Sequence, residues 1–225
     1  MEKLSRKGVA TQERILEVSL ELFNELGYAK TSMARIARQA AMSVGNLCYH
    51  FPAKKDLAVA LVERLAQQLE HGLTAARDPG PEVEVFVSFG YRTIQTMWDY
   101  RFALRDRTDY GAGTDGVPDL ARAPVAASQM EQIRSVLTRM RRAGLFSSDS
   151  ADLDMLTINI WIVARFWWEY LDEHEGCRNP TWEDHERGFI HVIGVVSPYL
   201  NARGQRKLDD ATTAIARATE NTHGR

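Results

Sequence analysis

Residues 31–57 read TSMARIARQAAMSVGNLCYHFPAKKDL and decide how the chain is organised. Apolar residues recur at helical spacing over positions 33–40 and predict one buried face of a short helix. Ser43 is a good N-cap for a second short helix, which must stop by Phe51 because Pro52 disfavours α geometry in the residue before it. Two short helices joined by a tight turn predict a helix-turn-helix, whose second helix can enter the major groove of DNA.

The second of these helices has an unusual outward face. Leu47 and Phe51 lie four residues apart and define its inner side, which leaves Gly45, Asn46 and Tyr49 roughly opposite. Glycine lets a backbone approach a phosphate closely, asparagine can pair with the N6 and N7 edge of adenine, and tyrosine can donate a hydrogen bond to a phosphate oxygen. The residue types on this face therefore favour DNA contact over simple solvation.

The order and spacing of these residues resemble the TetR family of bacterial transcriptional repressors. In that family a Leu-Tyr-Tyr-His-Phe-like string commonly ends the recognition helix and a lysine-containing helix start follows; this chain has LCYHF at 47–51 and KKDL at 54–57. The match covers about residues 11–65. The resemblance implies a sequence-specific regulator, most simply a repressor that binds a palindromic double-stranded DNA operator as a homodimer and is released by a small-molecule effector. It implies DNA contacts from Thr31, Ser32, Ser43, Val44, Gly45, Asn46, Tyr49, His50 and Lys54.

Three positions depart from the family pattern. Cys48 replaces a frequent aromatic residue, which removes one expected phosphate contact. Ala41 replaces the frequent turn glycine and carries strain of about 1 to 2 kcal/mol if its φ is positive. Ala53 stands where a Ser or Asn cap is common, so the following helix is expected to have a weak cap.

The charge distribution agrees with a DNA-binding N-terminal part. Residues 1–65 carry 10 Lys and Arg against 7 Asp and Glu, whereas residues 66–225 carry 18 against 23. The pI near 6.3 argues against a protein that coats DNA without sequence preference. Lys3, Arg6 and Lys7 precede the first expected helix and are interpreted as a flexible basic arm.

Composition limits the class of protein. The chain has 225 residues with 44% hydrophobic content, enough for a substantial core in one or two domains. It lacks an apolar run of the roughly 18 residues that a membrane span needs and a leader-like N-terminus, so we expect a cytoplasmic protein that makes no membrane contact. Cys48 and Cys177 have no CxxC spacing, and neither a disulfide framework nor a metal or other cofactor is expected.

Helical periods run through the chain with almost no strand alternation, which predicts an all-α fold. An N-terminal three-helix helix-turn-helix domain (1–52) is followed by a linking helix (about 53–76), a larger helical effector-binding and dimerisation domain (77–203), and a tail (204–225) expected as frayed helix or disorder. The expected helices lie at about 11–26, 33–40, 44–50, 53–76, 82–107, 118–123, 126–143, 150–173 and 182–202.

The last two long helices hold the densest aromatic content. By resemblance they pair with their symmetry mates in a four-helix dimer interface, while the alternative from the residues alone is that they only complete an intramolecular core. Aromatic residues with a few arginines also suit an apolar effector pocket, although such stripes more often form core. The candidate pocket residues are Trp98, Arg101, Phe102, Arg105, Trp161, Arg165 and Trp168.

Three rival functions remain open. An enzyme would use a C-terminal group of histidines and carboxylates, but their spacing matches no common metal motif. That group comprises Glu173, His174, Glu175, Asp184, His185, Glu186 and His191. A DNA-binding regulator without a small-molecule effector, or one that responds to redox conditions through Cys48, is the nearer alternative.

Overall fold

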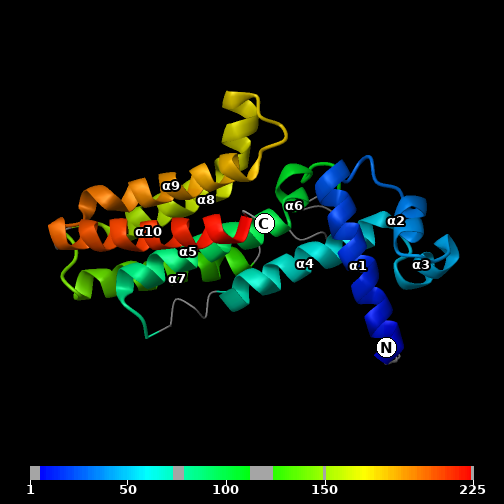
Figure 1. The fold of residues 1–225 in the computed structure, drawn as a ribbon, viewed down its shortest axis with the longest axis horizontal. Helices are drawn as coiled ribbons and strands as arrows, with labels where there is room; N and C mark the ends of the chain where they lie inside the picture. The colour runs from blue at the N-terminus through cyan, green and yellow to red at the C-terminus, as the bar shows by residue number, and fades with distance from the viewer. Residues whose placement is uncertain (1–5, 73–78, 112–123, 149–150, 224–225) are drawn as a thin grey trace. The chain divides into compact units, whose positions relative to one another are not determined.

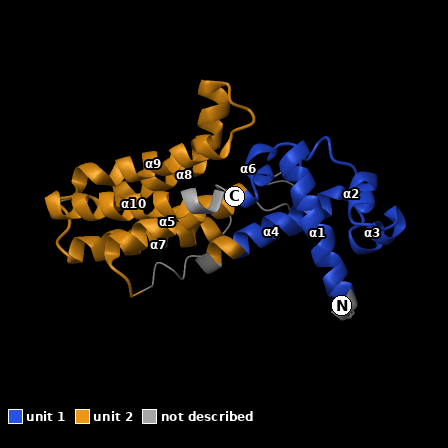
Figure 2. Cartoon of the chain, viewed as in Figure 1, with its two compact units in different colours: residues 1–67, 99–123 blue, residues 68–98, 124–225 orange. Residues whose placement is uncertain are grey.

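The structure is a computed structural model that describes residues 6–72, 79–111, 124–148 and 151–223 (Figure 1). Every regular element in these ranges is a helix, which confirms the expected all-α class. The chain divides into two compact units, one drawn from residues 1–67 and 99–123 and the other from residues 68–98 and 124–225 (Figure 2). Among the helices described, none is long and apolar enough to cross a membrane.

The first unit contains the expected helix-turn-helix. Its helices are α1 (Arg6–Leu26), α2 (Met33–Gln39), α3 (Val44–His50), the first part of α4 (Lys54–Gly72) and the short α6 (Phe102–Arg105). The side chains that build its core come from all of these helices, and the largest fully buried ones are Ile15, Phe23, Ile36, Leu47, Leu57, Leu61, Leu65 and Phe102. Helix α3 is therefore held by apolar burial on one side only.

Helix α1 begins earlier than its apolar stripe suggested. Arg6 and Lys7 already belong to the helix, so the interpretation of these two residues as part of a flexible arm is wrong; Lys3 lies outside the described residues. The C-terminal end of α1 at Leu26 agrees with the helix expected over about 11–26, and Gly27 follows it with a φ of +87°. Glycine tolerates this left-handed conformation because it has no Cβ.

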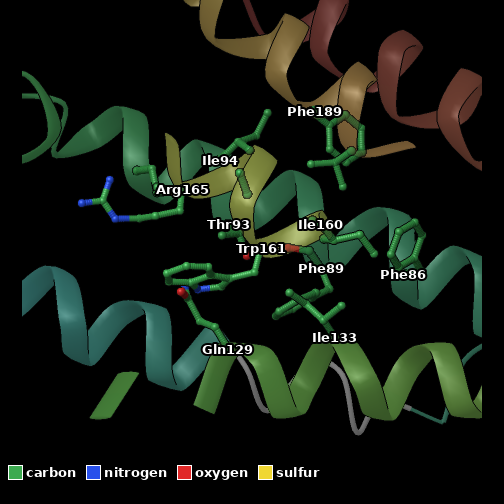
Figure 3. Close-up of a pocket in the computed structure, with 14 residues that line it drawn as sticks. Phe86, Phe89, Thr93, Ile94, Gln129, Ile133, Ile160, Trp161, Arg165 and Phe189 are labelled. Carbon is green, nitrogen blue, oxygen red and sulfur yellow. Dashed lines mark hydrogen bonds between the residues drawn. The ribbon is translucent and has the colours of Figure 1, made fainter. Parts of the chain in front are cut away.

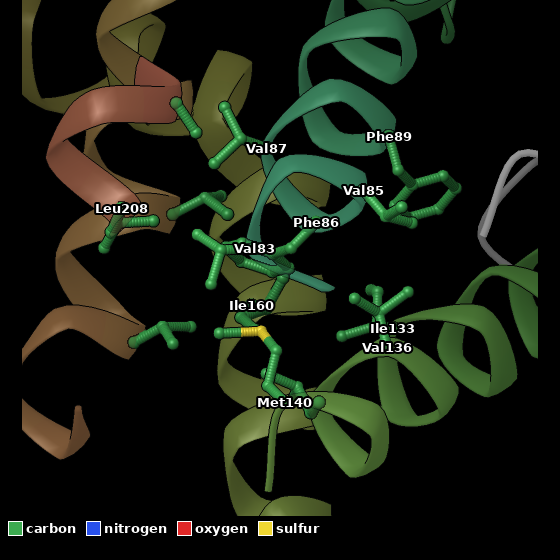
Figure 4. Close-up of a cluster of buried hydrophobic side chains, with 14 of the residues drawn as sticks. Val83, Val85, Phe86, Val87, Phe89, Ile133, Val136, Met140, Ile160 and Leu208 are labelled. Carbon is green, nitrogen blue, oxygen red and sulfur yellow. The ribbon is translucent and has the colours of Figure 1, made fainter. Parts of the chain in front are cut away.

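The second unit is a helical body. Its elements are α5 (Glu82–Asp99), α7 (Pro124–Arg142), α8 (Leu153–Glu175), α9 (Trp182–Val196), the 3-10 turn η2 (Ser197–Tyr199) and α10 (Ala202–His223). Side chains from α5, α7, α8, α9 and α10 share one core, part of which is shown in Figure 4. Phe86, Ile133, Met140, Ile160 and Leu208 are among its members.

Two expected boundaries differ from the structure. The helix predicted over 82–107 ends at Asp99, and α6 follows as a separate turn in the other unit. The helix predicted over 182–202 ends at Val196, where η2, with Pro198 near its start, interrupts it. The helix predicted at 118–123 lies outside the described residues.

The C-terminal segment is not a tail. Helix α10 extends to His223, and Leu208 and Ala211 are buried in the core of the second unit, so the expectation of fraying or disorder after Arg203 is wrong. The start of α10 lies very close to the segment that follows α7, since a Cβ at Gly204 would lie 2.6 Å from the carbonyl oxygen of Leu145. This contact needs glycine and fixes where α10 starts.

Candidate DNA-binding and effector sites

Local hydrogen bonds define the start of each helix of the helix-turn-helix. The Oγ of Ser32 accepts a hydrogen bond from the amide of Arg35 at 3.2 Å, and the Oγ of Ser43 accepts one from the amide of Asn46 at 3.1 Å. Both serines are thus N-caps, and each satisfies a backbone donor that the helix leaves unpaired. The cap at Ser43 is the one that the sequence predicted.

The turn between α2 and α3 depends on a left-handed alanine. Ala41 has a φ of +52°, the only positive φ outside glycine among the described residues. The amide of Met42 donates to the carbonyl of Ala37 at 2.9 Å, which closes the end of α2. The expected strain of about 1 to 2 kcal/mol is therefore present at Ala41.

Helix α3 turns its polar face outward. Leu47 is completely buried, whereas Val44, Gly45, Asn46 and Tyr49 are exposed, and the side chain of Tyr49 is 79% exposed. A tyrosine this exposed can donate its hydroxyl hydrogen bond to a phosphate oxygen. The exposed face of α3 is the one that the sequence assigned to DNA.

His50 and Cys48 occupy the margins of this face. His50 is half-buried, its ring meets that of Tyr49 edge-on at 5.2 Å, and its Nδ1 is buried with no hydrogen-bond partner among the described residues. Cys48 is a half-buried free thiol. A DNA contact from His50 and redox sensing by Cys48 both stay predictions.

Thr31 has an internal role, which corrects the expectation that its side chain contacts DNA. The residue is 1% exposed, and its Oγ1 donates to the carbonyls of Gly27 at 2.9 Å and Leu22 at 3.3 Å. These bonds tie the segment before α2 to the end of α1. Ser32, the next residue, is exposed and remains a candidate for a backbone contact.

Lys54 also has an internal role. Its Nζ donates hydrogen bonds to the carbonyls of Tyr28 at 2.8 Å and Thr31 at 3.0 Å and lies 4.1 Å from the centre of the Tyr28 ring. Partial burial lowers the pKa of this ammonium group from its usual value. Lys54 therefore fastens the start of α4 to the turn between α1 and α2, and most of its donors are already used.

The weak cap expected at Ala53 is offset by a residue of the first turn of α4. The Oδ2 of Asp56 accepts a hydrogen bond from the amide of Ala53 at 2.8 Å. This is one half of a capping box, and the acidic residue also complements the positive end of the helix dipole. The sequence contained this signal in the short spacing between Ala53 and Asp56.

Helix α6 is joined to the end of α1 by buried polar contacts. The side chain of Asn24 donates to the carbonyl of Asp99 at 2.8 Å and accepts from the amide of Phe102 at 3.1 Å. The guanidinium of Arg105 donates to the carbonyls of Phe23 at 2.8 Å and Asn24 at 3.2 Å. The helix-turn-helix unit thus includes a segment far along the chain that the domain boundaries predicted from sequence left out.

Asp106 completes this attachment. Its carboxylate accepts a hydrogen bond from the amide of Tyr28 at 2.8 Å and pairs with Arg105, with 2.8 Å between Oδ1 and Nε. Arg105 and Phe102 were expected in an effector pocket, but the structure uses both inside the first unit. The ring of Phe102 packs on that of Phe23 with the centroids 5.2 Å apart.

The second unit contains an apolar cavity of about 70 Å³ (Figure 3). Helices α5, α7, α8 and α9 form its wall, with Phe86, Phe89, Gly90, Thr93, Ile94, Met97, Gln129, Ile133, Ile160, Trp161, Ala164, Arg165, Phe189 and Val192. Of the candidate pocket residues, Trp161 and Arg165 line this cavity. The sequence did not predict the cavity residues of α5, although the apolar side chains of this helix recur at the three- and four-residue spacing that a buried helical face shows.

Arg165 is the charged residue of the cavity wall. It is 7% exposed, and its Nη1 donates to Oε1 of Glu169 at 3.1 Å. Its Nε is buried and has no hydrogen-bond partner among the residues described. A buried cationic group with an unused donor is costly unless something else compensates it.

Trp98 and Trp168 lie instead in an aromatic cluster around His185. The Nδ1 of His185 accepts from the indole of Trp168 at 2.9 Å, its Nε2 donates to the carbonyl of Ile94 at 2.9 Å, and its ring stacks on Trp98 with 5.6 Å between centroids. Burial lowers the pKa of His185 to about 4, so the ring is neutral at pH 7. Arg101, the residue before α6, is likewise absent from the cavity wall.

The C-terminal histidines and carboxylates considered for an enzyme do not form a catalytic or metal-binding arrangement among the described residues. His185 has both ring nitrogens engaged, and the ring of His191 packs on Trp167 with centroids 4.8 Å apart. In the described part of the chain, no group of three or more His, Cys, Asp or Glu side chains is arranged to hold a metal ion.

Helix α8 carries a row of exposed apolar side chains. These residues recur every three or four positions, so they share one face of the helix. They are Met155, Ile158, Ile162, Phe166 and Tyr170, and Ile190 on α9 is exposed as well. We call these six residues the α8–α9 apolar face. Its extent exceeds the scattered exposed hydrophobics of an ordinary surface.

Gly188 and Gly194 on α9 differ in their surroundings. A Cβ at Gly188 would lie 2.7 Å from the ring of Trp167, so α8 and α9 approach closely there. Gly194 is exposed and has nothing within 4 Å of a Cβ position. Its glycine therefore has no role in packing within the described part of this chain.

Comparison with known proteins identifies the family of the chain. The family model described as "Bacterial regulatory proteins, tetR family" matches residues 15–61, and the one described as "Bacterial transcriptional repressor" matches residues 64–208. The HTH-type transcriptional regulator UidR of Escherichia coli (strain K12) is 30% identical over 105 residues, which are 47% of this chain and 52% of UidR. The match thus spans about half the length of that relative.

Solved structures share the fold. A TetR-family transcriptional regulator from Marinobacter aquaeolei VT8 superposes with a TM-score of 0.75 at 22% identity, covering 90% of this chain and 97% of that one. A gamma-butyrolactone receptor, described as ArpA-like, superposes with a TM-score of 0.63 at 19% identity and covers 92% and 98%. With one family model on the helix-turn-helix and another over more than half of the chain, the protein belongs to the TetR family of bacterial transcriptional regulators.

Proposed function

We propose that this protein is a repressor that binds a palindromic DNA operator as a homodimer and leaves it when a small molecule occupies the second unit. The observation that carries the proposal is the exposed polar face of α3, with Gly45, Asn46 and Tyr49 in solvent and Leu47 buried beneath them. A rigid helix that buries one side and exposes hydrogen-bonding groups on the other suits the major groove.

The residues of this face would have different tasks. Asn46 would read a base, because its amide can pair with both the N6 and the N7 of an adenine. Ser32, Ser43, Val44, Gly45, Tyr49 and His50 would position the helix against sugar and phosphate. Lys54 would act mainly through the two carbonyls that it holds, and any phosphate contact would use its remaining donor.

A dimer is supported by two arguments. One short α3 reads few base pairs, whereas a pair related by a two-fold axis reads two half-sites. The α8–α9 apolar face offers a surface for that pairing, because a second copy would remove its exposed apolar side chains from water. Phe166 and Tyr170, two of its members, are the aromatic residue types enriched in protein interfaces.

An effector site is supported by the cavity of the second unit and by the course of the chain. Thr93, Ile94 and Met97 of α5 line the cavity, and the same chain continues through Asp99 into α6, which is fixed to α1 by Asn24 and Arg105. A ligand that changes the packing of α5 would therefore act on a segment attached to the helix-turn-helix unit. The solved gamma-butyrolactone receptor shows that a small-molecule receptor can have this fold.

Selection of bound fragments from random DNA tests the proposal. The full chain is expected to enrich sequences with two inverted half-sites about one helical turn apart, or a multiple of that. Asn46→Ala should lose about 1 to 3 kcal/mol of discrimination at one base pair in each half-site while it keeps affinity for the rest. Ser88→Ala, on α5 in the second unit, is the control and should leave the enriched sequence unchanged.

One result would contradict this function, and a second would contradict only the base-reading role of Asn46. Absence of any enriched sequence would remove the DNA-reading role of α3. Equal loss of affinity by Asn46→Ala on every sequence would show that Asn46 contacts the DNA backbone and that another residue reads the bases.

A further inference from the structure

The cavity of the second unit is smaller than most sites for organic ligands. Its volume of about 70 Å³ is roughly half of the ~150 Å³ at which an apolar cavity holds a benzene molecule. Since benzene has six carbon atoms, this proportion leaves room for about three or four heavy atoms. A ligand that the cavity accepts without rearrangement is therefore smaller than one aromatic ring.

Close packing between α5 and α9 limits the cavity on one side. A Cβ at Gly90 would lie 3.0 Å from the ring of Phe189, so this ring lies directly against the backbone of α5. Phe189 is buried, as are Phe89 and Ile160, and the three side chains lie around the cavity as members of the core (Figure 3). Widening the cavity here would break contacts of a close-packed core.

The wall offers few polar partners to a ligand. The hydroxyl of Thr93 already donates to the carbonyl of Phe89 at 2.9 Å. The charge of Arg165 is already paired with Glu169, with 3.1 Å between Nη1 and Oε1. Gln129, half-buried on α7, is the other polar side chain of the wall. A charged ligand would lose its hydration here without gaining a counter-ion, so an uncharged, apolar ligand is favoured.

We infer that this cavity binds an uncharged, apolar molecule of about three or four heavy atoms, a short hydrocarbon or a small halocarbon, and that the packing of its wall excludes larger molecules. This inference rests on the proposed effector site and names the size and chemistry of its ligand. A ligand of about four heavy atoms binds at best with a dissociation constant of about 0.05 mM, so the concentrations that matter extend into the millimolar range.

Titration of the full chain with chloroform, acetate and benzene tests the inference. Chloroform and acetate have equal numbers of heavy atoms, but only chloroform is uncharged; benzene is uncharged and larger. The measurement follows the NMR signal of the indole of Trp161, a wall residue, assigned from a Trp161→Phe variant. Chloroform should shift this signal saturably and bind at least ten times more tightly than acetate or benzene.

Two substitutions in the wall should change the preference in opposite ways. Ala164→Leu adds three carbon atoms and should weaken chloroform binding at least tenfold; Ala164→Val, a smaller addition, is used if the leucine variant does not fold. Ile133→Ala removes three carbon atoms and enlarges the cavity toward the volume that holds benzene, so benzene should bind at least ten times more tightly than to the parent.

Leu208→Ala is the matched control for Ile133→Ala. It removes the same number of carbon atoms from the same core, but Leu208 is not part of the cavity wall. Benzene should therefore shift the Trp161 signal of this variant no more than that of the parent. Urea unfolding of each variant establishes that it is folded before the titrations.

Four results overturn the inference: acetate binding to the parent as tightly as chloroform, benzene doing so, unchanged chloroform binding in a folded Ala164 variant, or no gain of benzene binding in Ile133→Ala. Operator binding by the same preparations, measured without any probe, separates this inference from the proposed function. Intact operator binding with a failed preference rejects only the ligand class, whereas the expected preference without operator binding rejects the proposed function.

Discussion

Replacement of Lys54 by methionine tests whether Lys54 stabilises the fold or contacts DNA. The ammonium group donates to the carbonyls of Tyr28 and Thr31 and lies against the Tyr28 ring. Hydrogen bonds from a charged donor contribute about 1.5 to 3 kcal/mol each when well buried. Because Lys54 is only partly buried, we expect about 2 to 3 kcal/mol for both bonds together.

The position of Lys54 strengthens this reasoning. It is the first residue of α4, where a positive charge is unfavourable to the helix dipole by up to about 1 kcal/mol. A lysine at such a position must be favoured by other contacts, and the two carbonyls supply them. Methionine keeps the apolar stem over Tyr28 and removes only the donors and the charge.

Two measurements on the Lys54→Met protein check the expectation. Urea unfolding should show a loss of about 2 to 3 kcal/mol in the free energy of unfolding of the first unit. Fluorescence anisotropy with operator DNA at several salt concentrations should give nearly the same salt dependence as the parent, since a lost phosphate contact would lower the slope by about 0.9. Lys30→Met, at an exposed neighbouring lysine, is the control and should change stability by less than about 0.5 kcal/mol.

The opposite pattern would refute the reasoning. The Lys54→Met protein would then have the same free energy of unfolding as the parent, while the slope of log affinity against log salt concentration falls by about 0.9, the value for one phosphate contact. This result would show that Lys54 acts on DNA and that the two carbonyl contacts contribute little to stability.

Other changes test separate features. Ala41→Gly should raise the free energy of unfolding by about 0.5 to 1 kcal/mol, because relief of left-handed strain exceeds the extra entropy of glycine in the unfolded chain; calorimetry showing a lower Tm would contradict this. The pKa of His185 is near 4 when folded and about 6.5 when unfolded, so the unfolded state binds more protons between these values. Stability of the second unit should therefore fall by roughly 3 kcal/mol as the pH drops from 7 to 4, and His185→Gln should remove that part of the pH dependence; equal profiles for both proteins would exclude it. Ile162→Lys places a charge in the α8–α9 apolar face and should give a monomer with weakened operator binding, whereas an unchanged dimer in sedimentation velocity would place the interface elsewhere.

Local signals in the sequence predicted the helix-turn-helix well. Ser43 is an N-cap, Leu47 is buried under the exposed face of α3, and α1 ends at Leu26. Each of these features depends on residues within a few positions of one another. Hydrophobic period and cap chemistry are sufficient for such features.

Features that depend on distant residues were not predictable in this way. Lys54 bonds to carbonyls 23 and 26 positions away, and Arg105 bonds to carbonyls 81 and 82 positions away. A charged side chain in the sequence gives no indication of which carbonyl it will meet, so Lys54 was assigned to phosphate and Arg105 to a ligand. Thr31 was assigned to DNA because burial of a hydroxyl cannot be read from a single position.

The sequence did not predict that α10 packs into the core, for a different reason. Its sequence is rich in Ala, Thr and charged residues, which resembles a solvated tail. The signal that it packs is sparse, with Leu208, Ala211 and Ile215 at a spacing of three and four residues. The cavity on α5 was overlooked because its apolar face could equally have been core, and only the packed structure shows which part of that face borders open space.

The attachment of α6 matters for any fusion of this DNA-binding unit to the effector-binding domain of another protein. A fragment cut after α4 would lose the partners of Asn24 and the cap that Arg105 and Asp106 place on the end of α1. A chimaera that retains the native operator specificity must therefore carry the 99–111 segment with the N-terminal helices, because a module of this protein is defined by spatial contacts and not by one continuous stretch of chain.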